Sequence, residues 1–278
     1  MSAEISPLLV FSDLDGSLLD HYSYSFQEAV PAIRALERHG IPLIVASSKT
    51  RAEIVELRNE LGNNHPFIVE NGAAVFIPQR YFPHQPEGTD VVDEFWVHAT
   101  VPSRHHWLAE LRALEEDFAG EFMSFHSAGV AGIMAMTGLT EHQAANANNR
   151  HYSEPVKWLG HPQQETDFIQ RLQDRGATVV KGGRFLSVSG SCDKGKALHW
   201  LRARYQETMP CDTIKDLAAG DSENDRLMLE AAATALVIRS PVHDFPALAK
   251  VDGVIRSKKT GPAGWAEGVL QWLALNGY

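Results

Sequence analysis

Two carboxylates near the start of the chain have a spacing that could place both in one site at the end of a strand. Asp13 and Asp15 follow the apolar run from Leu8 to Phe11, and Gly16 and Ser17 complete the segment. A short apolar run of this kind is typical of a buried strand, and open α/β sheets bind ligands at the carboxyl ends of their strands. The pattern predicts a functional site at Asp13 and Asp15, although it also suits an acidic turn without a chemical role.

Three later positions supply polar groups that a reaction at a phosphate ester requires. Ser47 and Asp221 each follow an apolar run, and Lys194 begins a helix-like segment. A carboxylate that attacks a phosphate ester forms an aspartyl-phosphate, which divides a difficult hydrolysis into two easier displacements. The segment from Asp13 to Ser17 offers a carboxylate for this attack. Asp15 would protonate the leaving oxygen and then activate a water molecule.

The same groups suggest how the negative charge of a phosphate would be neutralised. The carboxylates of Asp13 and Asp221 and the main-chain carbonyl of Asp15 are hard oxygen ligands, which suit Mg²⁺. The Ser47 hydroxyl and the Lys194 ammonium are donors for the oxygens of the transferring phosphoryl group. The sequence therefore predicts a magnesium site formed by Asp13, Asp15 and Asp221, beside a phosphate site formed by Ser47 and Lys194.

Two further residues belong to the segment that contains Asp221. Asn224 and Asp225 follow it within Gly220 to Asp225. We expect both to support the metal through water or through other ligands. Asn and Asp are also preferred at helix N-termini, so a purely capping role is the alternative.

The periodicity of apolar residues indicates the elements that position these groups. Strands and helices alternate with short connections, a pattern that implies a parallel sheet covered on both faces. The expected strands lie near 8–11, 41–46, 67–69, 213–219 and 235–238, and the expected helices near 27–39, 51–61, 194–205, 226–233 and 264–275.

The pattern changes in the middle of the chain. Alternation of apolar and polar residues over 91–97 predicts a half-exposed strand. We expect another strand over 154–159, and a hairpin of 178–181 with 184–189 around Gly182 and Gly183. Helices are expected from Ser103, over 140–149 and over 163–175. We therefore predict a discontinuous α/β core domain over 1–85 and 187–278, interrupted by an α+β domain over 86–186.

Composition excludes several classes of function. The net charge is −10 and the pI is about 5.7, whereas nucleic-acid binding requires basic surface. No apolar run reaches the roughly 18 residues of a membrane helix, and the first residues lack the regions of a signal peptide. Cys192 and Cys211 form no disulfide framework or zinc pattern. We expect a cytoplasmic protein that binds a small molecule, as a monomer or homodimer, without nucleic-acid or membrane partners.

Together, the four motifs resemble those of the haloacid dehalogenase-like (HAD) phosphatases. In chain order they are Asp13-x-Asp15-Gly16-Ser17, Ser47, Lys194 and Gly220-Asp221-Ser222-x-Asn224-Asp225. In that superfamily the first Asp is the nucleophile, the second is the acid and base, the hydroxyl and lysine bind phosphate, and the last motif holds Mg²⁺. The resemblance implies a Rossmann-like core with an inserted α+β cap that selects sugar or polyol phosphates. Ser replaces the commoner Thr at Ser17 and Ser47 but keeps the hydroxyl.

Shorter motifs are similar to those of mannosyl-3-phosphoglycerate phosphatases. They are Ser47 to Thr50, Val69 to Ala73, Gly182 to Phe185 and Gly261 to Trp265. This similarity implies a glycosyl-3-phosphoglycerate substrate, mannosyl first, that is hydrolysed to the glycosylglycerate and phosphate.

The implied substrate suggests roles for several other side chains. Arg184 is the candidate for a two-pronged contact with the glycerate carboxylate. Lys181 and Arg150 are its backups, unless these side chains are solvated surface charges. Asn71 would contact sugar hydroxyls or simply form a turn, and Ser48 is a further candidate for contact with the substrate. Glu154 would accept from sugar hydroxyls or pair with an arginine of the insertion.

Three alternative functions remain open. A phosphatase for another sugar or polyol phosphate, such as glucosyl-3-phosphoglycerate, would have the same core and a different cap specificity. A phosphomutase would return the phosphoryl group to its substrate. A non-catalytic sugar-phosphate-binding protein would be expected to lack Asp13, Asp15 or Lys194, all of which are present.

Overall fold

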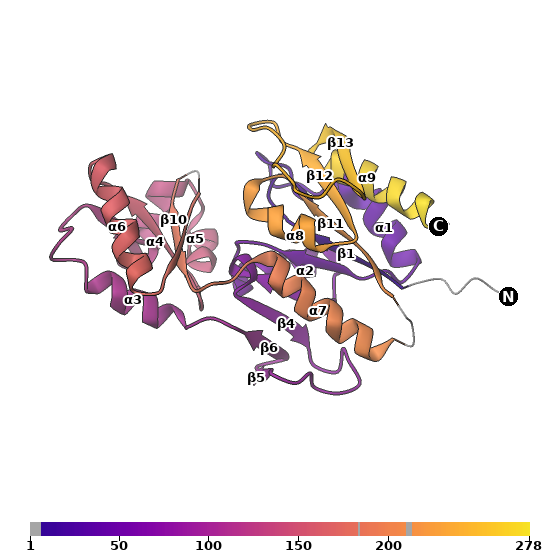
Figure 1. Cartoon of the computed structure of the whole chain (residues 1–278), viewed down its shortest axis with the longest axis horizontal. Coiled ribbons are helices and arrows are strands. Elements are labelled where there is room, and N and C mark those ends of the chain that lie inside the picture. The colour runs from indigo at the N-terminus through magenta and orange to yellow at the C-terminus, as the bar shows by residue number, and fades with distance from the viewer. Residues whose placement is uncertain (1–6, 183, 210–212) are drawn as a thin grey trace. The chain divides into compact units, whose positions relative to one another are not determined.

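The computed structural model describes residues 7–182, 184–209 and 213–278. Gly183 and Cys211, discussed above, lie outside these ranges. The chain divides into two compact units (Figure 1). We call them the core unit, with residues Met1–Ser47, Asn63–His98 and Asp193–Tyr278, and the cap unit, with residues Ser48–Gly62 and Ala99–Cys192.

The core unit is built on one large sheet whose strand order is β13-β12-β11-β1-β2-β3-β4-β6-β5. Its strands are β1 (Leu8–Ser12), β2 (Leu43–Ala46), β3 (Phe67–Val69), β4 (Ala74–Pro78), β5 (Asp90–Val92), β6 (Phe95–Ala99), β11 (Lys215–Gly220), β12 (Thr234–Arg239) and β13 (Val254–Thr260). Neighbouring strands from β13 to β3 run parallel, and β4 returns antiparallel to β3. The predicted parallel sheet is confirmed.

The helices of the core unit cover both faces of this sheet. They are α1 (Val30–Arg38), α7 (Lys194–Thr208), α8 (Arg226–Ala231) and α9 (Gly261–Leu275), with short 3₁₀ turns η1 (Gln27–Ala29), η2 (Glu70–Gly72) and η3 (Glu223–Asp225). Successive strand residues point to opposite faces. Leu9 and Phe11 of β1 accordingly belong to one core cluster with Leu198 of α7, whereas Ser12 accepts a hydrogen bond from Trp265 of α9 at 2.9 Å.

The cap unit contains a separate antiparallel sheet with the order β7-β8-β10-β9. Its elements are α2 (Arg51–Leu61), α3 (Arg104–Arg112), β7 (Phe122–Ser124), α4 (Phe125–Thr137), α5 (Glu141–Asn148), β8 (Glu154–Trp158), α6 (Pro162–Asp174), β9 (Thr178–Lys181) and β10 (Leu186–Ser189). Trp107 of α3, Phe168 of α6 and Val156 of β8 pack into one buried cluster. The predicted α+β character of the insertion is confirmed.

Two parts of the structure differ from the sequence predictions. The single strand predicted over 91–97 is a hairpin of β5 and β6, because Asp93 adopts a positive φ of 52° and turns the chain; Asp tolerates this conformation well. The strand β7 and the helix α4 were not predicted from the sequence. The α4 segment is rich in small residues, and Gly129, at φ 60° and ψ −177°, interrupts its helical backbone.

The two units do not coincide with the predicted domain ranges. Residues 86–98, which include β5, belong to the core unit, and α2 belongs to the cap unit. In the cap unit, Thr50 Oγ1 beside α2 donates a hydrogen bond to the Asn146 carbonyl of α5 at 2.8 Å. The assignment of a catalytic domain to 1–85 and 187–278 and of a substrate-selecting domain to 86–186 stays a prediction. Among the described residues, no helix is long and apolar enough to cross a bilayer.

Candidate active site

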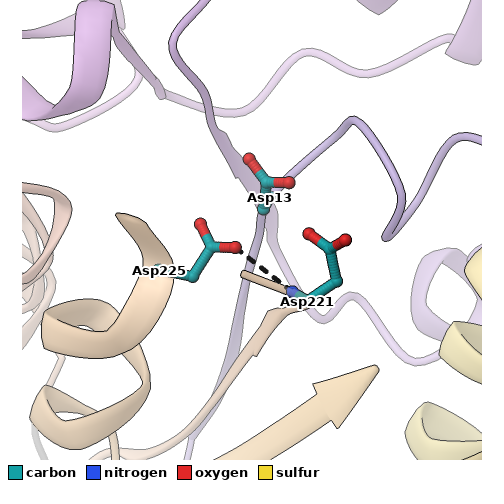
Figure 2. A group of neighbouring side chains, drawn as sticks. All are labelled: Asp13, Asp221 and Asp225. Atoms are coloured by element: carbon teal, nitrogen blue, oxygen red, sulfur yellow. Dashed lines mark hydrogen bonds between the residues drawn. The ribbon is translucent and has the colours of Figure 1, made fainter. Parts of the chain in front are cut away.

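Asp13 and Asp221 come together because β1 and β11 are neighbouring parallel strands. Ser12 pairs in register with Ala219, and Asp13 N donates a hydrogen bond to the Ala219 carbonyl at 2.8 Å. Asp13 and Asp221 are therefore the next residues at the carboxyl ends of their strands. Both are buried, with 5% and 4% of their surface exposed, and Figure 2 shows their side chains beside that of Asp225.

The loop after β1 is folded tightly against Asp221. Gly16 N donates to the Leu19 carbonyl at 2.9 Å, and Leu19 N donates to the Leu14 carbonyl at 2.8 Å. Gly16 has a φ of +80°, and a Cβ atom there would lie 2.5 Å from Asp221 Oδ2. Only glycine satisfies both the backbone conformation and this close approach. Asp15 is half-buried in the same loop.

Lys194 connects the two acidic segments. Its ammonium nitrogen lies 2.6 Å from Oδ1 of Asp13 and 2.6 Å from Oδ1 of Asp225, and the side chain is fully buried. Burial alone would lower the pKa of Lys194, but the carboxylates of Asp13 and Asp225 outweigh burial and raise this pKa above its ordinary value. Lys194 therefore remains a cation at neutral pH.

Asp225 has most of its hydrogen-bonding capacity committed to the protein. Its Oδ1 accepts from Lys194, while its Oδ2 accepts from the main-chain N–H groups of Asp221 and Ser222, each at 3.2 Å. This arrangement holds the Asp221 backbone in place. Asn224 is exposed, and its Oδ1 accepts a hydrogen bond from the Ser222 hydroxyl. The predicted support of a metal by Asn224 and Asp225 stays a prediction.

The acidic cluster fits a divalent cation. Asp13, Asp221 and Asp225 each offer a carboxylate oxygen, and the three oxygens lie within 4.8 Å of one another. One ammonium group, that of Lys194, does not neutralise three carboxylates. Burial, reinforced by Asp225, raises the pKa of Asp13 well above its usual value and that of Asp221 to about 6. A bound cation would relieve this repulsion, and hard carboxylate oxygens are the ligands that Mg²⁺ prefers.

Ser47 and Asn71 lie together at the ends of the next two strands. Ser47 is buried after β2, and its carbonyl accepts from Asn71 N at 2.9 Å. Asn71 has a φ of 60°, and its Oδ1 is buried without a hydrogen-bond partner among the described residues. Gly72 allows this turn to pack on the start of α7, since a Cβ there would lie 2.2 Å from the Asp193 carbonyl.

His243 was not predicted from the sequence as a residue of the site. It lies in the loop after β12, and its Nε2 is 3.4 Å from Asp221 Oδ2. Its Nδ1 faces the Asp244 carbonyl at 2.9 Å. The histidine is isolated in the sequence, so only the fold reveals that it reaches the acidic cluster.

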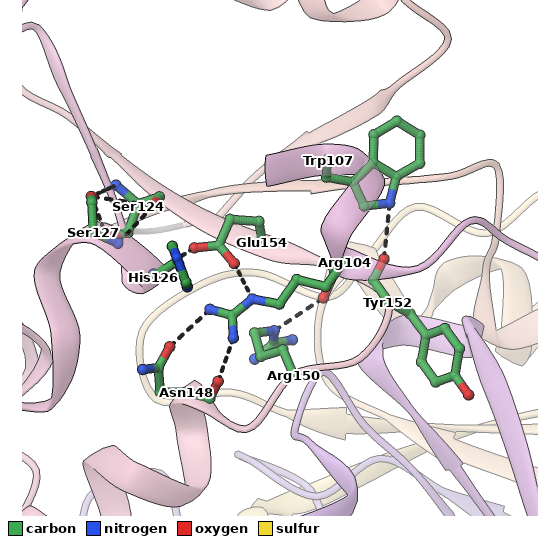
Figure 3. A network of polar contacts seen from close by, with 10 residues as sticks. Arg104, Trp107, Ser124, His126, Ser127, Asn148, Arg150, Tyr152 and Glu154 are labelled. Atoms are coloured by element: carbon green, nitrogen blue, oxygen red, sulfur yellow. Dashed lines mark hydrogen bonds and ion pairs between the residues drawn. The ribbon is translucent and has the colours of Figure 1, made fainter. Parts of the chain in front are cut away.

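In the cap unit, Glu154 belongs to a buried polar network around Arg104 (Figure 3). Glu154 Oε2 lies 2.5 Å from Arg104 Nε, and its Oε1 accepts from His126 N at 2.7 Å. Arg104 also donates to both the carbonyl and the side-chain Oδ1 of Asn148. Of the two roles considered for Glu154, pairing with an arginine of the insertion is confirmed.

The predicted substrate residues of the cap unit have different surroundings. The Ser48 carbonyl accepts a hydrogen bond from Arg150 at 2.8 Å. Lys181 is exposed and pairs with Glu165 at 2.6 Å. Arg184 is exposed with its guanidinium 5.8 Å from the Phe185 ring centre, and no described carboxylate pairs with it. Of the two cationic side chains, Arg184 is therefore the more available to an anion.

Comparisons with known proteins identify the family. The sequence profile of haloacid dehalogenase-like hydrolases matches residues 10–97, and that of sucrose-6F-phosphate phosphohydrolases matches residues 163–273. A glucosyl-3-phosphoglycerate/mannosyl-3-phosphoglycerate phosphatase from Methanococcoides burtonii is 30% identical over 96% of this chain and 98% of its own length. The chain belongs to the haloacid dehalogenase-like hydrolases. The family prediction made from the four motifs is thus confirmed.

Two further proteins are similar to this chain, one in sequence and one in fold. A protein of the same name from Persephonella marina is 30% identical over 97% of this chain and 97% of its own length. A solved phosphatase of the haloalkanoate enzyme superfamily from Bacteroides thetaiotaomicron matches the fold with a TM-score of 0.66. It is 15% identical and the match covers 100% of this chain and 97% of that one, so it is evidence for the fold alone.

Proposed function

We propose that this hydrolase is a phosphatase that transfers the phosphoryl group of a glycosyl-3-phosphoglycerate to Asp13 and then to water. The observation that carries the proposal is the buried Asp13 carboxylate, held by Lys194 beside Asp221. Both curated relatives described above are named for glucosyl- and mannosyl-3-phosphoglycerate, so these two substrates are the first candidates. Mannosyl-3-phosphoglycerate is our first choice.

In the first step, a carboxylate oxygen of Asp13 attacks phosphorus and the phosphorus–oxygen bond of the ester breaks. Lys194 binds Oδ1 of Asp13, while Oδ2 has no hydrogen-bond donor among the described residues and keeps its lone pairs for attack. Asp15 donates a proton to the departing oxygen, which leaves as the alcohol. Lys194 and the Ser47 hydroxyl would stabilise the charge on the phosphoryl oxygens.

In the second step, Asp15 accepts a proton from water and the resulting oxygen attacks the aspartyl-phosphate. The acyl–phosphate bond breaks, inorganic phosphate leaves and the Asp13 carboxylate is restored. Asp13, Asp15 and Asp221 would hold Mg²⁺, supported by Asn224 and Asp225. When bound, the ion would supply positive charge that offsets the repulsion between Asp13 and the substrate phosphate.

Removal of divalent metal should stop the reaction. We expect excess EDTA to lower the phosphate-release rate at least about 100-fold, because Lys194 alone does not neutralise the acidic cluster and the substrate. Addition of Mg²⁺ beyond the chelator should restore the rate, whereas an equal ionic strength of NaCl should not. Full activity of the metal-stripped protein in EDTA would contradict the role of a metal.

We assign the glycerate carboxylate to Arg184, with Lys181, Ser48 and Asn71 as further substrate contacts. Arg184→Ala should raise KM for glycosyl-3-phosphoglycerate about tenfold, because a charged hydrogen bond is worth about 1.5–3 kcal/mol. The effect on an aryl phosphate, which has no carboxylate, should be much smaller. Arg175→Ala is the matched control, since Arg175 is also an exposed arginine of the cap unit and is paired with Glu110 at 2.9 Å. Equal KM changes for both substrates in Arg184→Ala would contradict the assignment of the glycerate carboxylate to Arg184.

The function itself is tested by a phosphate-release screen over sugar phosphates that includes mannosyl- and glucosyl-3-phosphoglycerate. We expect stoichiometric release of phosphate and of the glycosylglycerate. Retention of the phosphoryl group in an isomeric product would indicate a phosphomutase. Tight binding without turnover of any ester would indicate a sugar-phosphate-binding protein instead.

A further inference from the structure

The loop that follows β12 forms a polar hollow beside the acidic cluster. A cavity of about 430 Å³ is lined by the last residue of β12, Arg239, and by the loop residues Ser240, Pro241, Val242, His243, Asp244 and Phe245. All belong to the core unit, as does Asp221. The size is within the range of small-molecule sites.

His243 places this hollow next to the reaction centre. It lines the cavity, and its Nε2 lies 3.4 Å from Oδ2 of Asp221. β12 is also the parallel neighbour of β11, with Val237 in register with Gly220. The loop therefore begins at the same edge of the sheet as the acidic cluster, and the proposed mechanism gives it no role.

Two charged side chains that line the hollow are left available by the ion pairs of the described residues. Among the described residues, neither the Arg239 guanidinium nor the Asp244 carboxylate has an ion-pair partner, although both line the same cavity. Arg239 lies against the Phe245 ring at 5.5 Å from its centre, which restricts the guanidinium. One cation and one anion leave the hollow without a strong net charge, a property that suits a neutral ligand better than a carboxylate or phosphate.

We propose that this hollow binds the hydroxyl groups of the sugar in the glycosyl-3-phosphoglycerate substrate. Asp244 accepts hydrogen bonds from sugar hydroxyls, and Arg239 and Ser240 donate to sugar oxygens. Charged partners make the stronger hydrogen bonds. The inference rests on the proposed function, because it assigns a specificity site for that reaction within the core unit.

Binding to an inactive protein tests the hollow directly. The probe is mannosyl-3-phosphoglycerate, the first-choice substrate, titrated by calorimetry into Asp13→Asn and into Asp13→Asn/Asp244→Asn. We expect the second substitution to weaken binding about tenfold, since the carboxamide is a poorer acceptor of similar shape. Asp252→Asn is the matched control, because Asp252 is exposed in the same connection between β12 and β13 but lies outside the hollow.

A second probe separates the sugar from the rest of the substrate. 3-Phosphoglycerate carries the phosphate and the carboxylate but no sugar, and its affinity should change far less with Asp244→Asn. Equal weakening of both probes would overturn the assignment to the sugar, as would unchanged binding of the glycosyl compound. If Asp13→Asn binds neither probe, while the unaltered enzyme releases phosphate from other esters, the proposed substrate is wrong. The same titration is then made with the ester that is cleaved. If Asp13→Asn and Asp13→Asn/Asp244→Asn bind that ester equally well, the proposal that the hollow binds its sugar is overturned.

Discussion

Replacing Asp13 with asparagine is expected to lower kcat more than about 10⁴-fold, which corresponds to about 5.4 kcal/mol of activation free energy. The carboxamide has nearly the same shape but is a poor nucleophile, so no aspartyl-phosphate forms. Phosphate release from glucosyl- or mannosyl-3-phosphoglycerate measures the loss. The side chain is buried and its Oδ1 accepts from Lys194 at 2.6 Å, a contact that the asparagine oxygen can keep.

The fold of Asp13→Asn should therefore be retained. Its circular dichroism and thermal midpoint should remain close to those of the unaltered protein, because the substitution also removes one of three mutually repelling carboxylates. Rapid acid quench of the unaltered enzyme during turnover should show a phosphoryl adduct on the peptide that contains Asp13. Near-normal hydrolysis by Asp13→Asn, or an adduct on another residue, would contradict the assignment of Asp13 as the nucleophile.

Replacing Lys194 with methionine is expected to affect both stability and activity. The ammonium is fully buried and contacts Asp13 and Asp225, each at 2.6 Å. Removing one partner from a buried ion pair typically costs about 3–5 kcal/mol, and here the loss leaves the carboxylates of the cluster facing one another. Urea unfolding measures this change. We also expect kcat/KM to fall at least about 100-fold for every phosphate ester, because a phosphoryl-oxygen donor is lost.

Lys196→Met provides the comparison for Lys194→Met. Lys196 lies on the same helix but is exposed, and its interaction with Asp193 at 3.4 Å is on the surface. Its replacement should change the free energy of unfolding by less than about 0.5 kcal/mol. Adding Asp225→Asn to Lys194→Met should recover part of the lost stability by removing a buried charge. Similar stability losses in Lys194→Met and Lys196→Met would show that the buried ammonium does not hold the acidic cluster together.

The sequence by itself was enough to predict which carboxylates meet at the edge of the core sheet. The apolar run before Asp13 and the run before Asp221 both form buried parallel strands, β1 and β11. Because parallel strands place their carboxyl ends at one edge, local pattern was enough to predict that these carboxylates meet. The helix that begins at Lys194 was also predicted from local pattern, because its apolar positions recur with helical periodicity. These features depend on short-range pattern and on a few topological rules.

Tertiary structure decided the contacts that have no local signature. Asp225 was predicted to support a metal or to cap a helix. Only packing shows that one of its oxygens binds Lys194 while the other binds the Asp221 backbone. Glu154 had two possible roles until the fold placed Arg104 beside it. His243 and the hollow of its loop depend on strand order, which brings β12 next to β11. The contacts of Asp225 with Lys194, of Glu154 with Arg104 and of His243 with Asp221 join residues far apart in the chain. Hydrophobic periodicity carries no information about them.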